Sequence, residues 1–162
     1  MKKLFKLHSI VLLIGLTIAG QSVMAQGNKS VFVEFFGNGL GISANFDCRF
    51  SKKENGLGFR AGIGYMPPTF FSNGFATFPI GINHLLGKGP HYLESGIGVT
   101  IIPGVTVFGD DEFRTSGIIY MPSLGYRYAR NVKGFQGRIF ASPMVAEGEF
   151  QFFYGLSGGF KF

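Results

Sequence analysis

GISANFDCRF, residues 41–50, is the stretch of sequence that decides the fold. Its apolar residues occupy every second position from Ile42 to Phe50, and polar residues fill the positions between them, from Ser43 to Arg49. Successive side chains of a β-strand point to opposite faces, so this strict alternation predicts a strand with one apolar and one polar face. Which of the two faces points into the protein decides the class of fold.

The same alternation recurs along the rest of the chain. It is found in SVFVEFF (30–36), GLGFRAGIGY (56–65), ATFPIGINH (76–84), HYLESGIGVTI (91–101), GIIYMPSLGYRY (117–128), GFQGRIFAS (134–142) and YGLSGGFKF (154–162). No stretch after residue 25 has a convincing helical period. The sequence therefore predicts an all-β domain of eight strands joined in an up-and-down order.

The N-terminus has the pattern of a secretory signal peptide. Lys2, Lys3 and Lys6 precede an apolar run over 9–19, and Val23-Met24-Ala25 resembles an A-x-A cleavage site. The alternative, a transmembrane anchor, needs about 20 apolar residues, and this run is shorter. We expect a signal peptide over 1–25, cleavage after Ala25, and a single exported domain over 26–162.

Composition restricts the function of this domain. Three of the fifteen Lys and Arg lie in the expected signal peptide, so twelve remain against nine acids and the formal charge falls from +6 to +3. That bias is too small to indicate nucleic-acid binding. The lone Cys48 excludes a disulfide framework within the chain. For a soluble domain, 20 Phe, 26 Gly and only 15% charged residues are unusual.

The polar faces distinguish a soluble barrel from a transmembrane one. They consist mainly of Gly, Ser, Thr and Asn, with single charges at Glu34, Asp47, Arg49, Arg60, Glu94, Arg127, Arg138 and Lys161. Glycine on a solvated face weakens a strand, whereas small residues suit the packed interior of an eight-stranded barrel. We therefore expect a closed antiparallel eight-stranded transmembrane β-barrel with its apolar face in lipid. The eight charges should point into the lumen and pair there.

The chain ends in the middle of an alternating segment, on Phe160, Lys161 and Phe162. Together with the eight amphipathic strands and the expected export, this ending resembles the small eight-stranded outer-membrane β-barrel family of Gram-negative bacteria. Phe160 and Phe162 match the aromatic positions of that family's C-terminal assembly signal, although Ser157 stands where such signals usually carry Gly. FPIGINHLLGKGPHYLESGIGVT (78–100) also resembles a segment of uncharacterised members. The resemblance implies outer-membrane lipid, lipopolysaccharide and the outer-membrane assembly machinery as partners.

Strand parity then predicts a topology. With both termini periplasmic, the GNG after the first strand is a tight turn at the cell surface. The turns at 51–55, 85–90 and 129–134 face the periplasm, and longer loops at 66–74, 102–116 and 144–149 face outside. Three prolines interrupt strands and should cause bulges or local breaks, at positions 79, 122 and 143. Cys48 should face lipid.

Signals of catalysis are weak. A lipid-modifying enzyme needs a nucleophile and a base within reach of each other, but His84 and His91 both flank one predicted periplasmic turn. GDDEFR (109–114) carries acidic residues whose spacing matches no defined cation site. We expect no catalytic residue, cofactor or metal, and a structural or surface-binding role through the outer loops, with a possible unknown surface ligand. A narrow transport or ligand-binding barrel, a lipid-modifying enzyme and a soluble periplasmic lipid-binding barrel remain alternatives.

Overall fold

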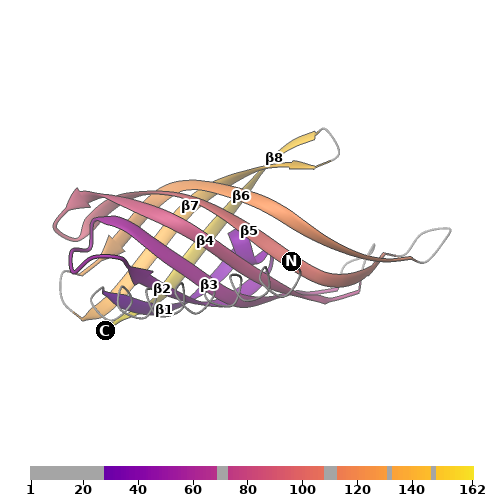
Figure 1. Ribbon diagram of the computed structural model, residues 1–162, viewed down its shortest axis with the longest axis horizontal. Helices are drawn as coiled ribbons and strands as arrows, with labels where there is room; N and C mark the ends of the chain where they lie inside the picture. Colours follow the sequence, from indigo (N-terminus) through magenta and orange to yellow (C-terminus); the bar gives the residue numbers. More distant parts are fainter. Residues whose placement is uncertain (1–27, 69–72, 108–112, 131–132, 147–148) are drawn as a thin grey trace, which may run out of the picture.

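The chain forms a closed β-barrel, shown in Figure 1 as a computed structural model. The structure describes residues 28–162 apart from 69–72, 108–112, 131–132 and 147–148. Its elements are β1 (Lys29–Phe36), η1 (Gly37–Gly39), β2 (Ile42–Arg49), β3 (Gly56–Met66), β4 (Phe75–Lys88), β5 (His91–Val107), β6 (Phe113–Ala129), β7 (Gly134–Ala146) and β8 (Glu149–Lys161). The predicted signal peptide lies outside the described residues. Within them, no helix has the length and apolar character required to cross a membrane.

Each strand pairs antiparallel with the next, and β8 pairs antiparallel with β1 to close the barrel. This seam runs from Ser30 opposite Lys161 to Phe36 opposite Gly155. It ends on the last residue of the chain, because Phe162 N–H donates to the carbonyl of Lys29 at 2.9 Å. The predicted all-β, closed, antiparallel, eight-stranded architecture is confirmed, and closure leaves no free sheet edge along the paired part of the wall.

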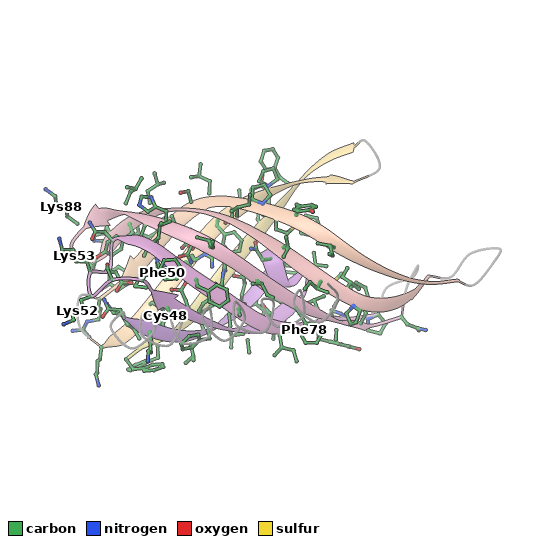
Figure 2. All side chains as sticks on the ribbon, in the orientation of Figure 1. Cys48, Phe50, Lys52, Lys53, Phe78 and Lys88 are labelled. Carbon is green, nitrogen blue, oxygen red and sulfur yellow. The ribbon has the colours of Figure 1, made fainter. Side chains whose placement is uncertain are left out.

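The apolar face of the strands points outward. Tyr120 and Ile97 are 71% and 65% exposed, whereas Arg127 on the opposite face of β6 is 1% exposed. Figure 2 shows Phe78 on the outside of the wall, and it shows Lys52, Lys53 and Lys88 gathered at the end where the short turns lie. A soluble barrel buries its apolar face and exposes its polar face, whereas this barrel does the reverse.

Several predicted loops are largely strand. β5 continues to Val107 and β6 begins at Phe113, so the predicted loop 102–116 is mostly a β-hairpin. Likewise β7 and β8 take up most of 144–149, and strand pairing reduces the predicted turn 85–90 to Gly89 and Pro90. Beyond Ile101, β5 pairs only with β6 in the described ladders. A two-stranded hairpin encloses no interior, so its sequence need not alternate.

Pro79 interrupts a strand ladder without shifting its register. In the described ladders the only register shift lies between Ile102 and Val105, beside Pro103. The β3–β4 ladder has no pair at Pro79 but resumes in the same register at Thr77. Of the expected bulge or local break, this site therefore has a local break, because the missing N–H removes a bond without adding a residue.

Cys48 stands between the inward-pointing Asp47 and Arg49 on β2, so it alternates onto the other face of the strand. Its side chain is buried there, and its Sγ lies 3.5 Å from the carbonyl oxygen of Arg49.

Candidate functional site in the barrel interior

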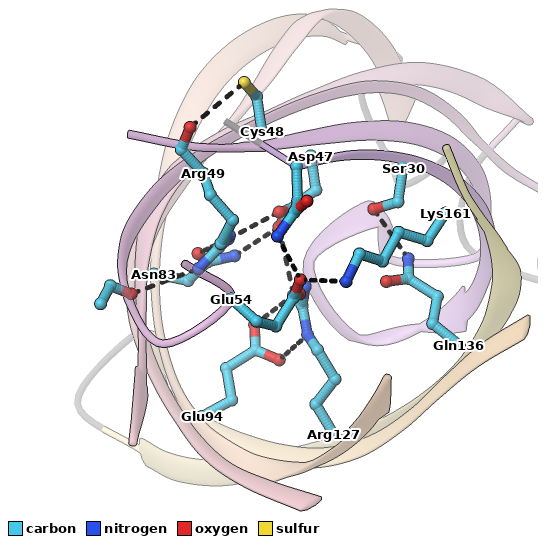
Figure 3. Close-up of polar contacts among 12 residues, drawn as sticks. Ser30, Asp47, Cys48, Arg49, Glu54, Asn83, Glu94, Arg127, Gln136 and Lys161 are labelled. Atoms are coloured by element: carbon cyan, nitrogen blue, oxygen red, sulfur yellow. Dashed lines mark hydrogen bonds and ion pairs between the residues drawn. The ribbon is translucent and has the colours of Figure 1, made fainter. Parts of the chain in front are cut away.

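Charged side chains from opposite walls meet in the middle of the lumen. Arg127 on β6 donates to both carboxylate oxygens of Glu94 on β5, at 2.8 and 3.0 Å, and its Nη2 also reaches Asp47 on β2 at 3.1 Å. Because β2 and β6 lie across the barrel from each other, Arg127 ties the two walls together (Figure 3). All three side chains are almost fully buried, where a charge is tolerated only when it is paired.

Asp47 also anchors a second set of contacts. Arg49 donates to its Oδ1 at 2.6 Å, and the Asn83 amide donates to its Oδ2 at 2.6 Å. Arg49 in turn donates to the Asn83 carbonyl oxygen. A β-carbon on Gly58 would overlap the Arg49 guanidinium, so glycine at this inward position of β3 makes room for the arginine. The small residues of the polar faces thus leave the space that the long charged side chains occupy.

Glu34 organises the side of the charge cluster that lies next to η1. Its Oε2 accepts from Arg60 at 2.9 Å and lies 3.3 Å from Nη1 of Arg138. Arg138 also lies 3.2 Å from Glu94, and its guanidinium stacks 3.9 Å from the centre of the Phe140 ring. The Arg138 nitrogens lie within ion-pair distance of Glu34 and Glu94 but make no hydrogen bond of good geometry. Three carboxylates therefore face four guanidiniums, and the ring of Phe140 supports the least well bonded one.

Lys161 does not join this cluster. Its Nζ lies 2.5 Å from the carboxylate of Glu54, and it donates to the carbonyl of Arg130 at 2.9 Å. Figure 3 shows Glu54 reaching from the turn between β2 and β3 toward Lys161. Lys161 therefore points into the lumen and is paired there, but its partner is Glu54, which was not among the predicted luminal charges. Glu54 was missed because it lies in a turn, where alternation gives no information about direction.

The segment after β1 corrects the predicted surface turn. η1 folds inward, and Asn38 and Leu40 are buried inside the barrel. Asn38 N–H donates to Glu34 at 3.1 Å, Thr77 Oγ1 donates to the carbonyl of Gly39 at 2.9 Å, and Thr100 Oγ1 donates to the carbonyl of Asn38 at 2.5 Å. The inward turn requires left-handed backbone at Phe36 (φ 59°) and Leu40 (φ 67°). Such conformations persist only where the surrounding structure holds them, here through the hydrogen bonds to Glu34 and the two threonines.

Apolar side chains lie inside the barrel beyond both ends of the charge cluster. On the short-turn side, Leu85, Tyr92 and Ala129 form a buried group. On the other side, Leu40, Ile102 and Met121 form a second one, named here the outer apolar cluster together with the partly buried Met66, Phe75, Ile119 and Phe153 that pack against it. The lumen thus has a polar centre between two apolar layers, which sequence alternation did not predict.

The histidines lie outside the lumen. His91 is exposed on the outer face, where its Nδ1 lies 2.5 Å from the hydroxyl of Tyr126 and its ring contacts Tyr126 and Tyr128. Glu94, the acid near it in sequence, points inward to Arg127. The described residues contain no group of three His, Cys, Asp or Glu side chains placed to hold a metal ion. The acidic residues 110–112 lie outside the described residues.

The two aromatic residues of the expected assembly signal lie on the outer face of β8. Phe160 and Phe162 are 58% and 51% exposed, and Lys161 between them points inward at 2%. This is the alternation of the C-terminal segment carried to the last residue of the chain.

Comparison with known proteins supports the fold alone. No protein-family model matches the sequence, and no curated protein matches it either. Among solved structures, the chain is similar to the N-terminal β-barrel domain of OprF from Pseudomonas aeruginosa, with a TM-score of 0.60 and 12% identity. The similarity covers 85% of this chain and 100% of that domain. At this identity it shows a shared eight-stranded barrel architecture.

Proposed function

We propose that the chain is an exported outer-membrane β-barrel that acts without catalysis, as a structural or surface-binding protein through its outer hairpins. The exposed apolar wall supports a lipid surrounding, since contiguous apolar surfaces of this extent are rare on soluble monomers. The closed ladder supports it as well, because lipid offers no hydrogen-bond partner to a free strand edge. Outer-membrane lipid and lipopolysaccharide are then its surroundings, and the assembly machinery would read Phe160 and Phe162.

The single observation that carries the non-transport role is the filled lumen. Charged side chains from β1, β2, β3, β5, β6 and β7 meet across the barrel centre, and η1 lies over them on one side. Eight strands enclose only enough space for side chains to fill. A continuous aqueous path would require both the ion pairs and η1 to move.

The location is tested first, by fractionating cells that express the full chain and running the membrane fraction with and without heating. We expect the protein in the outer-membrane fraction, with a faster-migrating unheated form that heating converts to the unfolded form. Recovery from the periplasm without detergent would contradict the membrane location and favour the soluble lipid-binding alternative.

The filled lumen is tested by conductance of the purified protein in planar bilayers. We expect no steady current from the native chain. A matched variant that lacks Gly37–Gly39 and carries Arg127→Ala opens both barriers, and it should conduct if the bilayer contains inserted barrels. Steady native conductance would favour the narrow transport barrel, and altered lipid A in cells that overexpress the protein would favour the lipid-modifying enzyme.

A further inference from the structure

A groove crosses the outer face of the wall where the barrel closes. It lies over β8, β1, β2 and β3 and has a volume of about 640 Å³, within the range of about 300–1,000 Å³ that is usual for small-molecule sites. Its outward-facing lining is apolar and includes Val31, Ala44, Phe46, Ala61, Gly158 and Phe160. The groove opens onto the face of the barrel that we propose lies in lipid.

The packing of the barrel does not require the small residue at the floor of this groove. Gly158 faces outward on β8, opposite Val33 of β1. A β-carbon on Gly158 would meet only the Phe135 ring, at 3.7 Å, which is an ordinary van der Waals contact. On the neighbouring Gly159, which faces the lumen, a β-carbon would overlap Phe32. The lumen therefore explains the glycine at position 159, whereas glycine at position 158 leaves open space on the outer wall.

Lysines border the groove at the short-turn end of the barrel. Lys29 is the next outward-facing residue of β1 after Val31. The Asn28 amide donates to the carbonyl of Lys52 at 3.3 Å, which places the turn after β2 beside the start of β1. Figure 2 shows Lys52 and Lys53 at this end of the molecule. The groove thus leads from an apolar wall to a cluster of positive charge.

The positive charge of these three lysines is not balanced within the protein. Among the described residues, none of the three forms an ion pair. Glu54, the acid of the same turn, is paired with Lys161. The terminal carboxylate of Phe162 lies nearby and accepts a hydrogen bond from the Lys29 N–H at 3.4 Å. Cations remain in excess at this corner, so an anion would be attracted to it.

The spacing of the groove and the lysine suits a lipid. Val33, in the groove, lies four positions along β1 from Lys29, which is about 14 Å along a strand. One leaflet takes up half of a hydrocarbon core about 30 Å thick, or about 15 Å. An acyl chain that lies in the groove would therefore bring its headgroup to the level of Lys29.

We propose that this groove holds an acyl chain of an anionic phospholipid of the periplasmic leaflet, with the phosphate of its headgroup at Lys29. A purely apolar ligand would make no use of the lysines, and a soluble anion would make no use of the groove. A phospholipid with net negative charge uses both, because its apolar surface leaves water and its phosphate meets a cation that has no other partner. The inference rests on the proposed membrane location, with the short turns in the periplasm.

The chain contains no tryptophan, so a single introduced Trp reports on one position. Phe46→Trp reports from the groove, and Leu93→Trp reports from the exposed wall of β5 on the other side of the barrel. Each variant is placed in vesicles that mix phosphatidylcholine with phosphatidylglycerol, in which only one of the two lipids carries brominated acyl chains that quench Trp fluorescence. The ratio of quenching by brominated phosphatidylglycerol to quenching by brominated phosphatidylcholine measures the preference for anionic lipid. We expect this ratio to be about two- to five-fold higher at Phe46→Trp, as for one exposed ion pair.

Matched variants separate the groove from general attraction to the lysines. Lys29→Gln should remove the difference between the two reporters, whereas Lys88→Gln, at an exposed lysine of the same end, should leave it. Gly158→Leu fills the floor of the groove and should also remove the difference. Ala141→Leu enlarges an outward-facing residue of β7 outside the groove and should not. Should Gly158→Leu fail to give a heat-modifiable band, Ala44→Leu fills the groove from β2.

The other outcomes overturn the inference. Equal ratios at the two reporters would show that the groove meets only bulk lipid, and the proposed membrane location would still stand. If both lipids quench Leu93→Trp and neither quenches Phe46→Trp, something else covers the groove, such as a second copy of the chain. If neither reporter is quenched, the membrane location fails together with the inference. A preference that survives filling of the groove would show that the lysines attract anionic lipid without an acyl-chain site.

Discussion

Arg127 holds Glu94 through two hydrogen bonds, 2.8 and 3.0 Å long, at the centre of a barrel whose interior water cannot easily reach. Both residues are also bound to other charges, Arg127 to Asp47 and Glu94 to Arg138. Removing either side chain therefore leaves its buried partners with one opposite charge too few. The loss of stability should exceed that caused by breaking an ion pair on a protein surface.

The first prediction is that Glu94→Gln lowers the free energy of unfolding by about 3–5 kcal/mol, the usual effect of breaking a buried ion pair. The neutral amide cannot balance the charge of Arg127, which remains buried. Urea unfolding of the barrel in vesicles, followed by the heat-modifiable band, measures the change.

A matched pair of variants tests the cause. Replacing both partners, with Glu94→Leu and Arg127→Leu, should cost less than Glu94→Gln alone, because apolar side chains leave no unpaired charge between these two positions. If the double variant is the less stable of the two, the ion pair contributes net stability and the reasoning above is wrong.

The second prediction concerns Lys161 and Glu54, which connect β8 to the turn between β2 and β3. Lys161→Met should destabilise the barrel by about 1–3 kcal/mol, since Glu54 then loses its cation while water at the barrel end still reaches it in part. Lys161→Arg should retain most of the stability, and Lys52→Met, at an exposed lysine of the same turn, should have almost no effect. Equal losses for Lys161→Met and Lys52→Met would contradict a specific ion pair.

The sequence predicted the wall of the barrel better than it predicted the contacts in the lumen. A period of two residues determines which side chains point inward, so the inward direction of residues such as Asp47 and Arg127 follows from alternation alone. Which of them touch does not, because Asp47 and Arg127 belong to strands four places apart whose relative height depends on the stagger of the whole barrel.

The connections were the least predictable part. GNG has the composition of a tight turn, and the sequence gives no sign that Thr77 and Thr100, far along the chain, bond its carbonyls and draw it inward. The outward hairpins were predicted as loops because they lack alternation.

The third prediction addresses the inward fold of η1. Replacing both Thr77 and Thr100 by Val removes two hydrogen bonds to carbonyls of η1 and should cost about 1–3 kcal/mol, as for two ordinary hydrogen bonds. The released segment should also admit brief current steps in planar bilayers, which the native barrel lacks. Ser95→Ala, at an outward position on β5, is the control and should change neither quantity. A stable, silent double variant would show that Glu34 alone holds η1.

The last prediction concerns the end of the chain. Phe162 closes the seam through its N–H bond to Lys29, and its ring lies exposed on the outer face beside Phe160. Deleting Phe162 removes a single backbone pair from a ladder that continues to Phe36, so a barrel already inserted should lose little stability. If the assembly machinery reads the terminal aromatic residue, the deletion should instead reduce the amount of heat-modifiable protein that reaches the outer membrane.

Two measurements on the same variant distinguish these effects. Pulse-labelled cells give the rate at which the heat-modifiable form appears, and urea unfolding of purified barrel in vesicles gives its stability. Phe162→Tyr keeps an aromatic ring and should behave as the native chain in both, whereas Phe162→Ala keeps the backbone bond to Lys29 and should resemble the deletion in assembly alone. Native assembly of the deletion variant would show that the assembly machinery does not require Phe162. The terminal aromatic residue would then serve only as an anchor at the membrane boundary.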